Sequence, residues 1–266
     1  MSVDVNTSEN EMTFWDHLEV LRWSLFRILA VLVVVLIGCF IAMPKIFDSF
    51  ILGATDGDFF LYKWLSGIGG GGNPLLPDFT NSDFHVDIIN INVASQFLTH
   101  ITTSFWLSLL LVFPYVIYEI WRFVRPALFP NEQRGVKRAF VCGGLLFYVG
   151  CAIGYTVVFP LTFRFLTEYQ VGGSIVNQIS LNSYMSNFLT LVFVMGIVFE
   201  IPMLAWVLSS MGILHKDFLK QYRKVAVAVL LILAAAITPS GDPFTLMVVF
   251  LPLYMLYELS ILVVKE

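Results

Sequence analysis

Long apolar runs, separated by short charged segments, make up most of this chain. A helix that crosses a membrane needs about 20 mostly apolar residues. Six runs approach or exceed this length, and they predict transmembrane helices over residues 23–43, 97–121, 139–165, 184–211, 222–238 and 244–264. The pattern therefore predicts an all-α integral membrane protein whose residues 1–266 form a single domain.

Prolines and helix length refine this picture. Pro44 follows the first run and is expected to end that helix, because proline lacks the backbone donor and clashes with the preceding turn. Pro160 and Pro202 lie inside the third and fourth runs. The apolar part of the fifth run, Val225–Ile237, spans only about 20 Å against a hydrocarbon core of about 30 Å. We expect a tight hairpin through residues 238–243, with local thinning of the bilayer.

The segment between the first two runs, residues 45–96, is the longest polar stretch. It contains several aspartates and the glycine run 69–72, which predicts a flexible loop. The other connections are short. The chain contains no internal repeat of the kind that marks many secondary transporters.

Composition supports a membrane protein and excludes several functions. The chain is 58% hydrophobic and 13% charged, against about 25% charged residues in soluble domains. A net charge of −4 gives no basic face for nucleic acid. The N-terminal residues 1–16 lack a basic stretch, so no cleavable signal peptide is expected. Cys39, Cys142 and Cys151 lie in apolar runs and are expected to be small buried residues.

The distribution of lysine and arginine predicts the orientation, because these residues gather on the cytoplasmic side. With the N-terminus inside, only Lys45, Lys63 and Arg164 of the 15 basic residues lie outside. The other twelve lie inside: Arg22, Arg27, Arg122, Arg125, Arg134, Lys137, Arg138, Lys216, Lys220, Arg223, Lys224 and Lys265. We therefore expect both termini in the cytoplasm.

The sequence offers little for catalysis. It contains no HExxH, CxxC, GxSxG or Walker A pattern. None of His17, His85, His100 and His215 is spaced to share a metal ion with another. We expect neither an enzyme nor a bound metal or cofactor.

Polar groups inside the membrane are costly, so they are candidates for function. Glu200 lies well inside the fourth run, between Gly196 and Pro202. It is expected either to line a polar cavity or to hold two helices together. Glu258 lies near the inner end of the sixth run, where an interfacial carboxylate near Lys265 is an equal alternative.

Two inner segments combine charge with aromatic residues. In residues 118–134, an interfacial aromatic belt explains Trp121, Arg122 and Arg125 but leaves Glu132 unexplained. Glu132 is a candidate acceptor for a guanidinium group, which pairs with carboxylates through two hydrogen bonds. Residues 15–22 predict an amphipathic turn that enters the membrane and places Glu19 toward the inner water layer; an ordinary helix start with acids near its positive end is the alternative.

These segments resemble the motifs of one family. His17–Arg22 resembles the HLxELR entry motif of the TatC subunits of twin-arginine translocases. The first inner loop is similar to the family stretch at Tyr118, Trp121, Phe123, Pro126, Ala127 and Leu128, followed by Glu132. Further matches are residues 157–161, which include Pro160, the segment Phe199–Pro202, and Thr238–Pro239 followed by Asp242. The resemblance covers residues 12–264, with the motifs in order.

The resemblance implies a fold and a function. The fold is a curved wall of six transmembrane helices with a concave face. The function is that of a receptor and core subunit that binds Arg-Arg signal peptides and exports folded proteins across the cytoplasmic (inner) membrane, driven by the proton-motive force. The implied partners are single-span subunits of the TatA and TatB kinds, membrane lipid, and further subunits of an oligomeric complex.

The resemblance also implies which residues act. Glu132, Glu19, Phe123 and Arg22 are expected to contact the signal peptide, and Glu200 is the intramembrane polar site. The loop residues expected to matter are Pro126, Leu128, Pro160, Pro202, Pro239 and Asp242. Two positions depart from the family pattern: the entry-motif glutamate is replaced by Val20, with Glu19 about 100° around the helix, and Gln133 follows Glu132 where the family has arginine.

Two other functions stay open on sequence alone. An ion-coupled transporter of small solutes would need a substrate site between repeats, and the missing repeat counts against it. An intramembrane enzyme would need a nucleophile and base, and the missing motifs count against that.

Overall fold

The computed structural model describes residues 14–67, 84–127, 130–170, 172, 177–238 and 240–264, without the side chains of 14–17, 67, 127, 130–132 and 134. The long helices are α1 (Phe14–Ser49), α3 (Ser95–Val124), α4 (Pro130–Ile153), α6 (Leu181–Val198), α7 (Ile201–Ser210), α9 (Arg223–Ile237) and α10 (Pro243–Val263). Shorter elements are η1 (Ile51–Thr55), α2 (Phe60–Gly67), η2 (Arg125–Ala127), η3 (Gly154–Val158), α5 (Phe159–Glu168) and α8 (Lys216–Gln221). Strands β1 (Ile88–Ile89) and β2 (Ile179–Ser180) pair in parallel.

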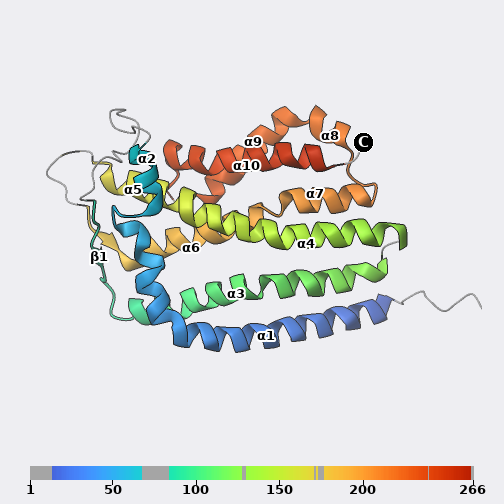
Figure 1. Cartoon of the computed structure of the whole chain (residues 1–266), viewed down its shortest axis with the longest axis horizontal. Coiled ribbons are helices and arrows are strands. Elements are labelled where there is room, and N and C mark those ends of the chain that lie inside the picture. The colour runs from blue at the N-terminus through green and yellow to red at the C-terminus, as the bar shows by residue number, and fades with distance from the viewer. Residues whose placement is uncertain are drawn as a thin grey trace, which may run out of the picture.

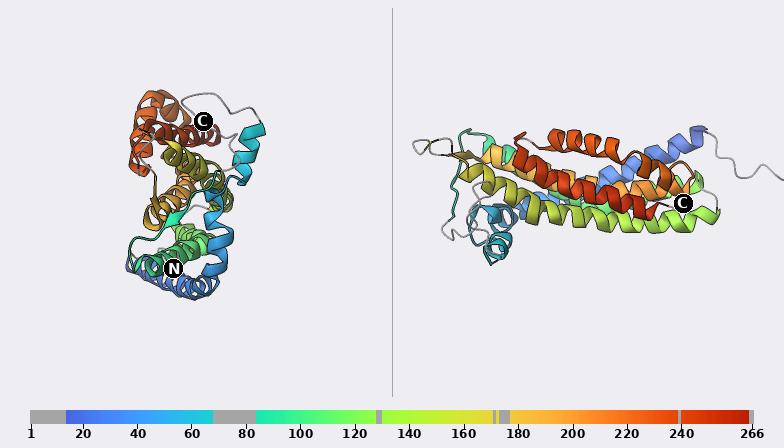
Figure 2. Two further views of the ribbon diagram at one scale, coloured as in Figure 1. Left: turned by 90° about the vertical axis from the view of Figure 1, so that its left-hand side faces the viewer. Right: turned by 90° about the horizontal axis from the view of Figure 1, so that it is seen from above.

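The long helices stand side by side as a wall rather than a closed bundle (Figures 1 and 2). Helices α1 and α3 form one edge, α4 with α6 and α7 forms the middle, and α9 with α10 forms the other edge (Figure 1). We call the end where α1 begins and α10 stops the N-terminal end, and the opposite end, which carries α2 and β1, the loop end (Figure 1). The predicted helical membrane fold is confirmed.

Five helical segments of the described residues are long and apolar enough to cross a membrane. They are Leu18–Thr55, Ser95–Val124, Gly135–Glu168, Leu181–Ser210 and Pro243–Val263. Helix α9 has only 15 residues, about 22 Å at 1.5 Å per residue. The chain turns back from α9 into α10 between Thr238 and Asp242, as the predicted hairpin requires.

The prediction that Pro44 ends the first helix is wrong, because α1 continues through Pro44 to Ser49. Proline leaves the carbonyl of the residue four positions earlier without its helical donor. Here that carbonyl belongs to Phe40, and it lies 2.8 Å from Nε2 of His100 on α3. The His100 ring also stacks on the Phe40 ring, with 4.0 Å between the centroids. A neighbouring helix thus supplies the donor that proline removes.

The same arrangement recurs at Pro114 inside α3. The carbonyl four residues earlier is that of Leu110, and it accepts a hydrogen bond from the Tyr148 hydroxyl of α4 at 3.1 Å. In a membrane, such freed backbone groups must find partners within the protein. Side chains from α3 and α4 therefore allow two long helices to pass through proline.

The third and fourth predicted spans are both interrupted. Helix α4 passes through the π-helical turn η3 before α5, which has Pro160 in its first turn. Helices α6 and α7 are separated by a turn at Phe199 and Glu200, with Pro202 in the first turn of α7. Both interruptions precede a proline, which fits the first turn of a new helix because its missing donor is not needed there.

Glycines bring α4 and η3 against α6. A Cβ atom added at Gly150 would lie 2.7 Å from the Met195 carbonyl oxygen and 2.7 Å from Cβ of Phe199. One added at Gly154 would lie 2.9 Å from Cα of Val192. Small residues at helix crossings let backbones approach closely inside membranes.

The loop end is held by buried aromatic and charged side chains. The Tyr62 hydroxyl donates to the carbonyls of Pro160 at 3.1 Å and Ala54 at 3.2 Å. Arg164 is fully buried, pairs with Glu168 at 2.8 Å, and stacks over the rings of Tyr62 and Phe84. These contacts fasten η1, α2 and Phe84 to α5.

The cysteines divide into two groups. All three are free thiols; Cys39 and Cys151 are buried, as expected, and Cys142 is exposed. The prediction that Cys142 is buried is therefore wrong. Its apolar neighbours in sequence reflect a helix surface that faces lipid rather than the protein core.

Candidate functional site

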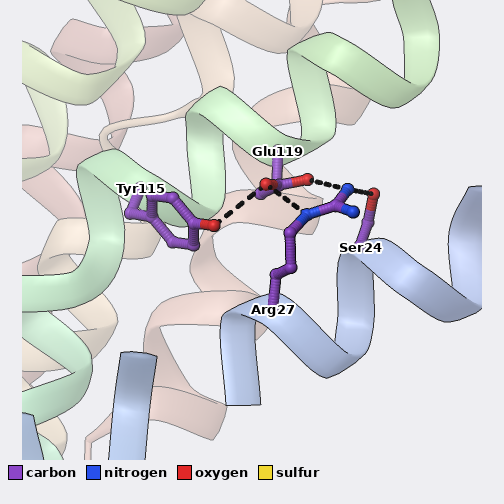
Figure 3. Close-up of polar contacts among 4 residues, drawn as sticks. All are labelled: Ser24, Arg27, Tyr115 and Glu119. Carbon is purple, nitrogen blue, oxygen red and sulfur yellow. Dashed lines mark hydrogen bonds and ion pairs between the residues drawn. The ribbon is translucent and has the colours of Figure 1, made fainter. Parts of the chain in front are cut away.

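An ion pair joins α1 to α3, the two helices at one edge of the wall, toward its N-terminal end. Arg27 on α1 donates from Nε to Oε1 of Glu119 at 2.9 Å and from Nη2 to Oε2 at 2.8 Å. Figure 3 shows the guanidinium facing the carboxylate across the two helices. The Glu119 side chain is only 1% exposed. The paired donors and acceptors form the bidentate geometry that makes such pairs strong.

Two hydroxyl groups complete this cluster (Figure 3). Tyr115 donates to Oε1 of Glu119 at 3.0 Å, and Ser24 accepts from Nη2 of Arg27 at 3.0 Å. A buried ion pair repays its desolvation only when its remaining hydrogen-bonding capacity is satisfied. Four side chains from α1 and α3 therefore fix the spacing between these helices.

Neither Glu119 nor its pairing with Arg27 was predicted from the sequence. A usable signal was present, since each residue places a charge inside an apolar run and each charge needs a partner there. The spacing along the chain does not say which helices are neighbours. Only the fold shows that α1 lies against α3.

A groove opens beside this cluster. It is lined by Glu19, Val20, Trp23, Arg27 and Arg122, and its volume is about 340 Å³. We call it the α1–α3 groove. Glu19 and Val20 both line it, so the one-residue shift of the glutamate from the family position keeps a carboxylate in the same groove.

Glu19 has one weak internal partner. Nη2 of Arg22 lies 3.4 Å from Oε1 of Glu19, and both side chains are 61% exposed. The Arg22 guanidinium also lies 5.7 Å from the centre of the Trp23 ring. An exposed pair of this kind contributes little free energy, so the Glu19 carboxylate can exchange Arg22 for another guanidinium at small cost.

The α3–α4 connection carries the other predicted contacts. Phe123 lies half-buried in the last turn of α3, and Pro126 lies exposed in η2. Glu132 lies in the first turn of α4, but its side chain is outside the described part of the chain, as is all of Leu128. This connection lies at the N-terminal end, as does the start of α1 (Figure 1).

Glu200 lies at the turn between α6 and α7 and is 7% exposed. A Cβ atom added at Gly143 would come 2.6 Å from Oε2 of Glu200, so the carboxyl group lies directly over α4. Neither carboxyl oxygen has a hydrogen-bond partner among the described residues. A buried polar group without a partner is costly and calls for an explanation in function.

The α9–α10 hairpin has its own polar contacts. Glu258 pairs with Arg223 at 2.8 Å and accepts from the Tyr254 hydroxyl at 3.1 Å. The alternative partner considered from sequence, Lys265, lies outside the described residues. Arg223, which the hairpin brings beside α10, was not predicted as the partner of Glu258.

Asp242 caps the start of α10. Its Oδ1 accepts from the Thr245 amide at 2.7 Å, which satisfies a donor at the helix start. Burial alone would raise the pKa of Asp242, but hydrogen bonds from Ser240 and Thr245 outweigh it and hold the pKa below its ordinary value. Pro239, expected to matter in the same turn, lies outside the described residues.

The described residues include no group of three potential metal ligands. The site therefore has three parts. The Arg27–Glu119 ion pair joins α1 to α3, the exposed Glu19 carboxylate lies in the α1–α3 groove, and the buried Glu200 carboxyl group lies at the break between α6 and α7.

Comparison with known proteins identifies the family. A model of the family described as Sec-independent protein translocase protein (TatC) matches residues 16–252. The chain belongs to the TatC family. The resemblance drawn from the sequence motifs is therefore confirmed, and the TatC-family chain is a multi-pass membrane protein of Sec-independent protein transport.

Relatives and solved structures agree over nearly the whole TatC-family chain. It is 32% identical to the Sec-independent protein translocase protein TatC of Blattabacterium sp., over 97% of this chain and 96% of that protein. It is 32% identical to the Escherichia coli K12 protein of the same name, over 85% and 82%. A crystal structure of the twin-arginine translocase receptor TatC is similar with a TM-score of 0.71 at 25% identity, covering 94% of this chain and all of that one.

Proposed function

We propose that this protein is the receptor and core subunit of a twin-arginine translocase, which binds Arg-Arg signal peptides and exports folded proteins using the proton-motive force. The observation that carries the proposal is the exposed Glu19 carboxylate in the α1–α3 groove, at the end of the wall where the α3–α4 connection places Glu132. Two signal-peptide guanidinium groups need two carboxylates within reach of one short segment.

The Arg27–Glu119 pair supports this role by fixing the groove. Because it joins α1 to α3 through two short hydrogen bonds, the walls of the groove hold one spacing. A preformed site loses less conformational entropy on binding than a flexible one. Phe123, half-buried at the end of α3, is proposed to exclude water from the contacts, and Arg22 to occupy Glu19 until the peptide arrives.

Glu200 is proposed to act deeper in the membrane. Its carboxyl oxygens lack partners among the described residues, so the group is available to a polar group of an inserted signal peptide or of a partner helix. The proposed partners are single-span subunits of the TatA and TatB kinds within an oligomeric complex. The proposed setting is the cytoplasmic membrane, with both termini in the cytoplasm.

The topology can be tested by labelling. In a variant with Cys39, Cys142 and Cys151 replaced by serine, Gly71→Cys should react with a membrane-impermeant maleimide added to intact spheroplasts. The reason is the lysine and arginine bias, which places the N-terminal end of the wall inside. Asp217→Cys on α8, at the N-terminal end, should react only after permeabilisation. Reversed labelling of the two positions would refute the proposed orientation.

The receptor role predicts that Glu132→Gln weakens binding of an Arg-Arg signal peptide by about 10- to 150-fold, the range expected when one charge-assisted pair is lost. The substitution keeps the size of the side chain and removes its charge. Binding of a fluorescent signal peptide to purified protein, with a Lys-Lys peptide for comparison, measures the effect. Glu19→Gln should give a smaller loss, because Glu19 is shifted by one residue from the position of the family's glutamate.

Asp217→Asn is the matched control, since Asp217 is an exposed acid in the first turn of another helix at the same end. It should leave the affinity unchanged. Unchanged affinity in Glu132→Gln, Glu19→Gln and the double variant would remove the carboxylate contact from the proposal. The family assignment would stand, because it depends on similarity along the chain.

A further inference from the structure

A second groove lies between α3 and α4 at the N-terminal end. It has a volume of about 780 Å³, larger than the α1–α3 groove. We call it the α3–α4 groove. Helix α3 contributes Pro114, Ile117, Tyr118, Trp121 and Arg122, η2 contributes Arg125, and helix α4 contributes Lys137, Phe140, Val141, Gly144, Leu145 and Tyr148.

The charged groups of this groove all carry the same sign and gather at one end. Arg122, Arg125 and Lys137 are exposed, and they lie at the C-terminal end of α3 and near the start of α4. No acidic residue is among the described residues that line the groove. The nearby Glu119 faces α1 instead, where Arg27 neutralises it. The mouth of the groove is therefore suited to an anion.

The rest of the groove is apolar and extends along α4, away from the cations. Beyond the cations, it is lined by aromatic and aliphatic side chains, of which Tyr118, Val141 and Leu145 are more than half exposed. From Lys137 to Tyr148 the groove follows α4 for 11 residues, about 16 Å at 1.5 Å per residue. One leaflet of the hydrocarbon core is about 15 Å thick, half of about 30 Å. The groove thus has the length of an acyl chain.

We propose that the α3–α4 groove binds an anionic phospholipid. The phosphate lies among Arg122, Arg125 and Lys137, where guanidinium groups can pair with it bidentately. An acyl chain lies along Trp121, Phe140 and Leu145 toward the middle of the membrane. Basic pockets between transmembrane helices commonly hold anionic headgroups in this way.

The charge of the groove argues against the signal peptide as its occupant. Among the described residues that line its mouth, a segment with two consecutive arginines would meet three cations, whereas the α1–α3 groove offers it the Glu19 carboxylate. Arg122 lines both grooves, so a bound lipid phosphate would also lower the positive potential beside Glu19. On the proposed receptor function, the lipid then favours approach of a cationic signal peptide; the lipid site itself does not depend on that function.

The test is lipid binding to the purified full-length protein in a neutral detergent, measured by native mass spectrometry. The probes are phosphatidylglycerol, phosphatidylcholine of the same chain length, and glycerol phosphate. Phosphatidylglycerol should bind at least tenfold more tightly than phosphatidylcholine. The triple variant Arg122→Gln/Arg125→Gln/Lys137→Gln should lose this preference, at about fivefold in affinity for each charge.

A matched triple variant, Arg138→Gln/Lys220→Gln/Lys224→Gln, removes three exposed cations elsewhere at the same end and should bind phosphatidylglycerol within twofold of the unmodified protein. Gly144→Leu fills the floor of the groove at a position where an added Cβ meets nothing within 4 Å. It should weaken phosphatidylglycerol binding at least fivefold while keeping the cations and the unfolding temperature.

Three outcomes would overturn the proposal. Equal losses in the two triple variants would show that net charge, rather than this groove, attracts the lipid. Full affinity in Gly144→Leu would show that no acyl chain lies along α4. Competition by glycerol phosphate as strong as that by the whole lipid would identify a site for a soluble phosphate compound.

Discussion

The Glu119→Leu variant should lose about 1–3 kcal/mol of its free energy of unfolding, because Arg27 is only partly buried. Leucine keeps much of the volume, so the loss comes from Arg27, which is left as a charge between α1 and α3 without its bidentate partner. Reversible unfolding of the detergent-solubilised protein, followed by circular dichroism, measures the change. The loss should appear without any signal peptide present.

Two further variants separate the ion pair from a general effect of substitution. Arg27→Leu/Glu119→Leu should recover most of the loss, since replacing a whole buried pair by apolar groups is often neutral. Glu258→Leu breaks the more exposed pair with Arg223 and should cost under about 1 kcal/mol. If Glu119→Leu were no more harmful than Glu258→Leu, the proposed anchoring of the two edge helices would be wrong.

Gly150→Ala is expected to be the most damaging glycine-to-alanine substitution in α4. Its Cβ would lie 2.7 Å from a backbone carbonyl of α6, that of Met195, and equally close to Phe199. Neither atom is the end of a flexible chain, so α4 and α6 must separate. We expect a loss of about 1–3 kcal/mol, the usual cost of overpacking, seen as a lower unfolding temperature.

Gly144→Ala in the same helix is the matched control, because an added Cβ there meets nothing within 4 Å. It should leave stability unchanged or raise it by about 0.5–1 kcal/mol, since alanine favours helix more than glycine does. A similar loss in both variants would show that the glycines act through helix propensity and not through the close approach of α4 and α6.

The sequence predicts the helices well because lipid imposes one strong rule. Every backbone group must be satisfied within the protein, so apolar runs of about 20 residues become helices. The break at Glu200 was not predicted, since the fourth run was expected to be one continuous helix with Pro202 inside it. The motif order then indicated the family, and the comparisons confirmed it.

The sequence does not show which helices lie next to each other in the fold. The expected stop at Pro44 failed because His100, sixty residues after Phe40, provides the donor that the Phe40 carbonyl lacks. The role of Glu119 was missed for the same reason, since its partner Arg27 lies on another helix. The predicted contacts of Glu132, Glu19, Phe123 and Arg22 with a signal peptide stay predictions.

The two proline carbonyls have a consequence for how the chain is made. The Phe40 carbonyl gains its donor only after residue 100 has entered the membrane, and the Leu110 carbonyl only after residue 148 has followed. Until then each carbonyl faces lipid unsatisfied, which is costly. During synthesis, α1 should therefore stay beside the insertion machinery until α3 arrives, and α3 until α4 arrives. The helices of the wall would then assemble in the membrane one after another, in the order of the sequence.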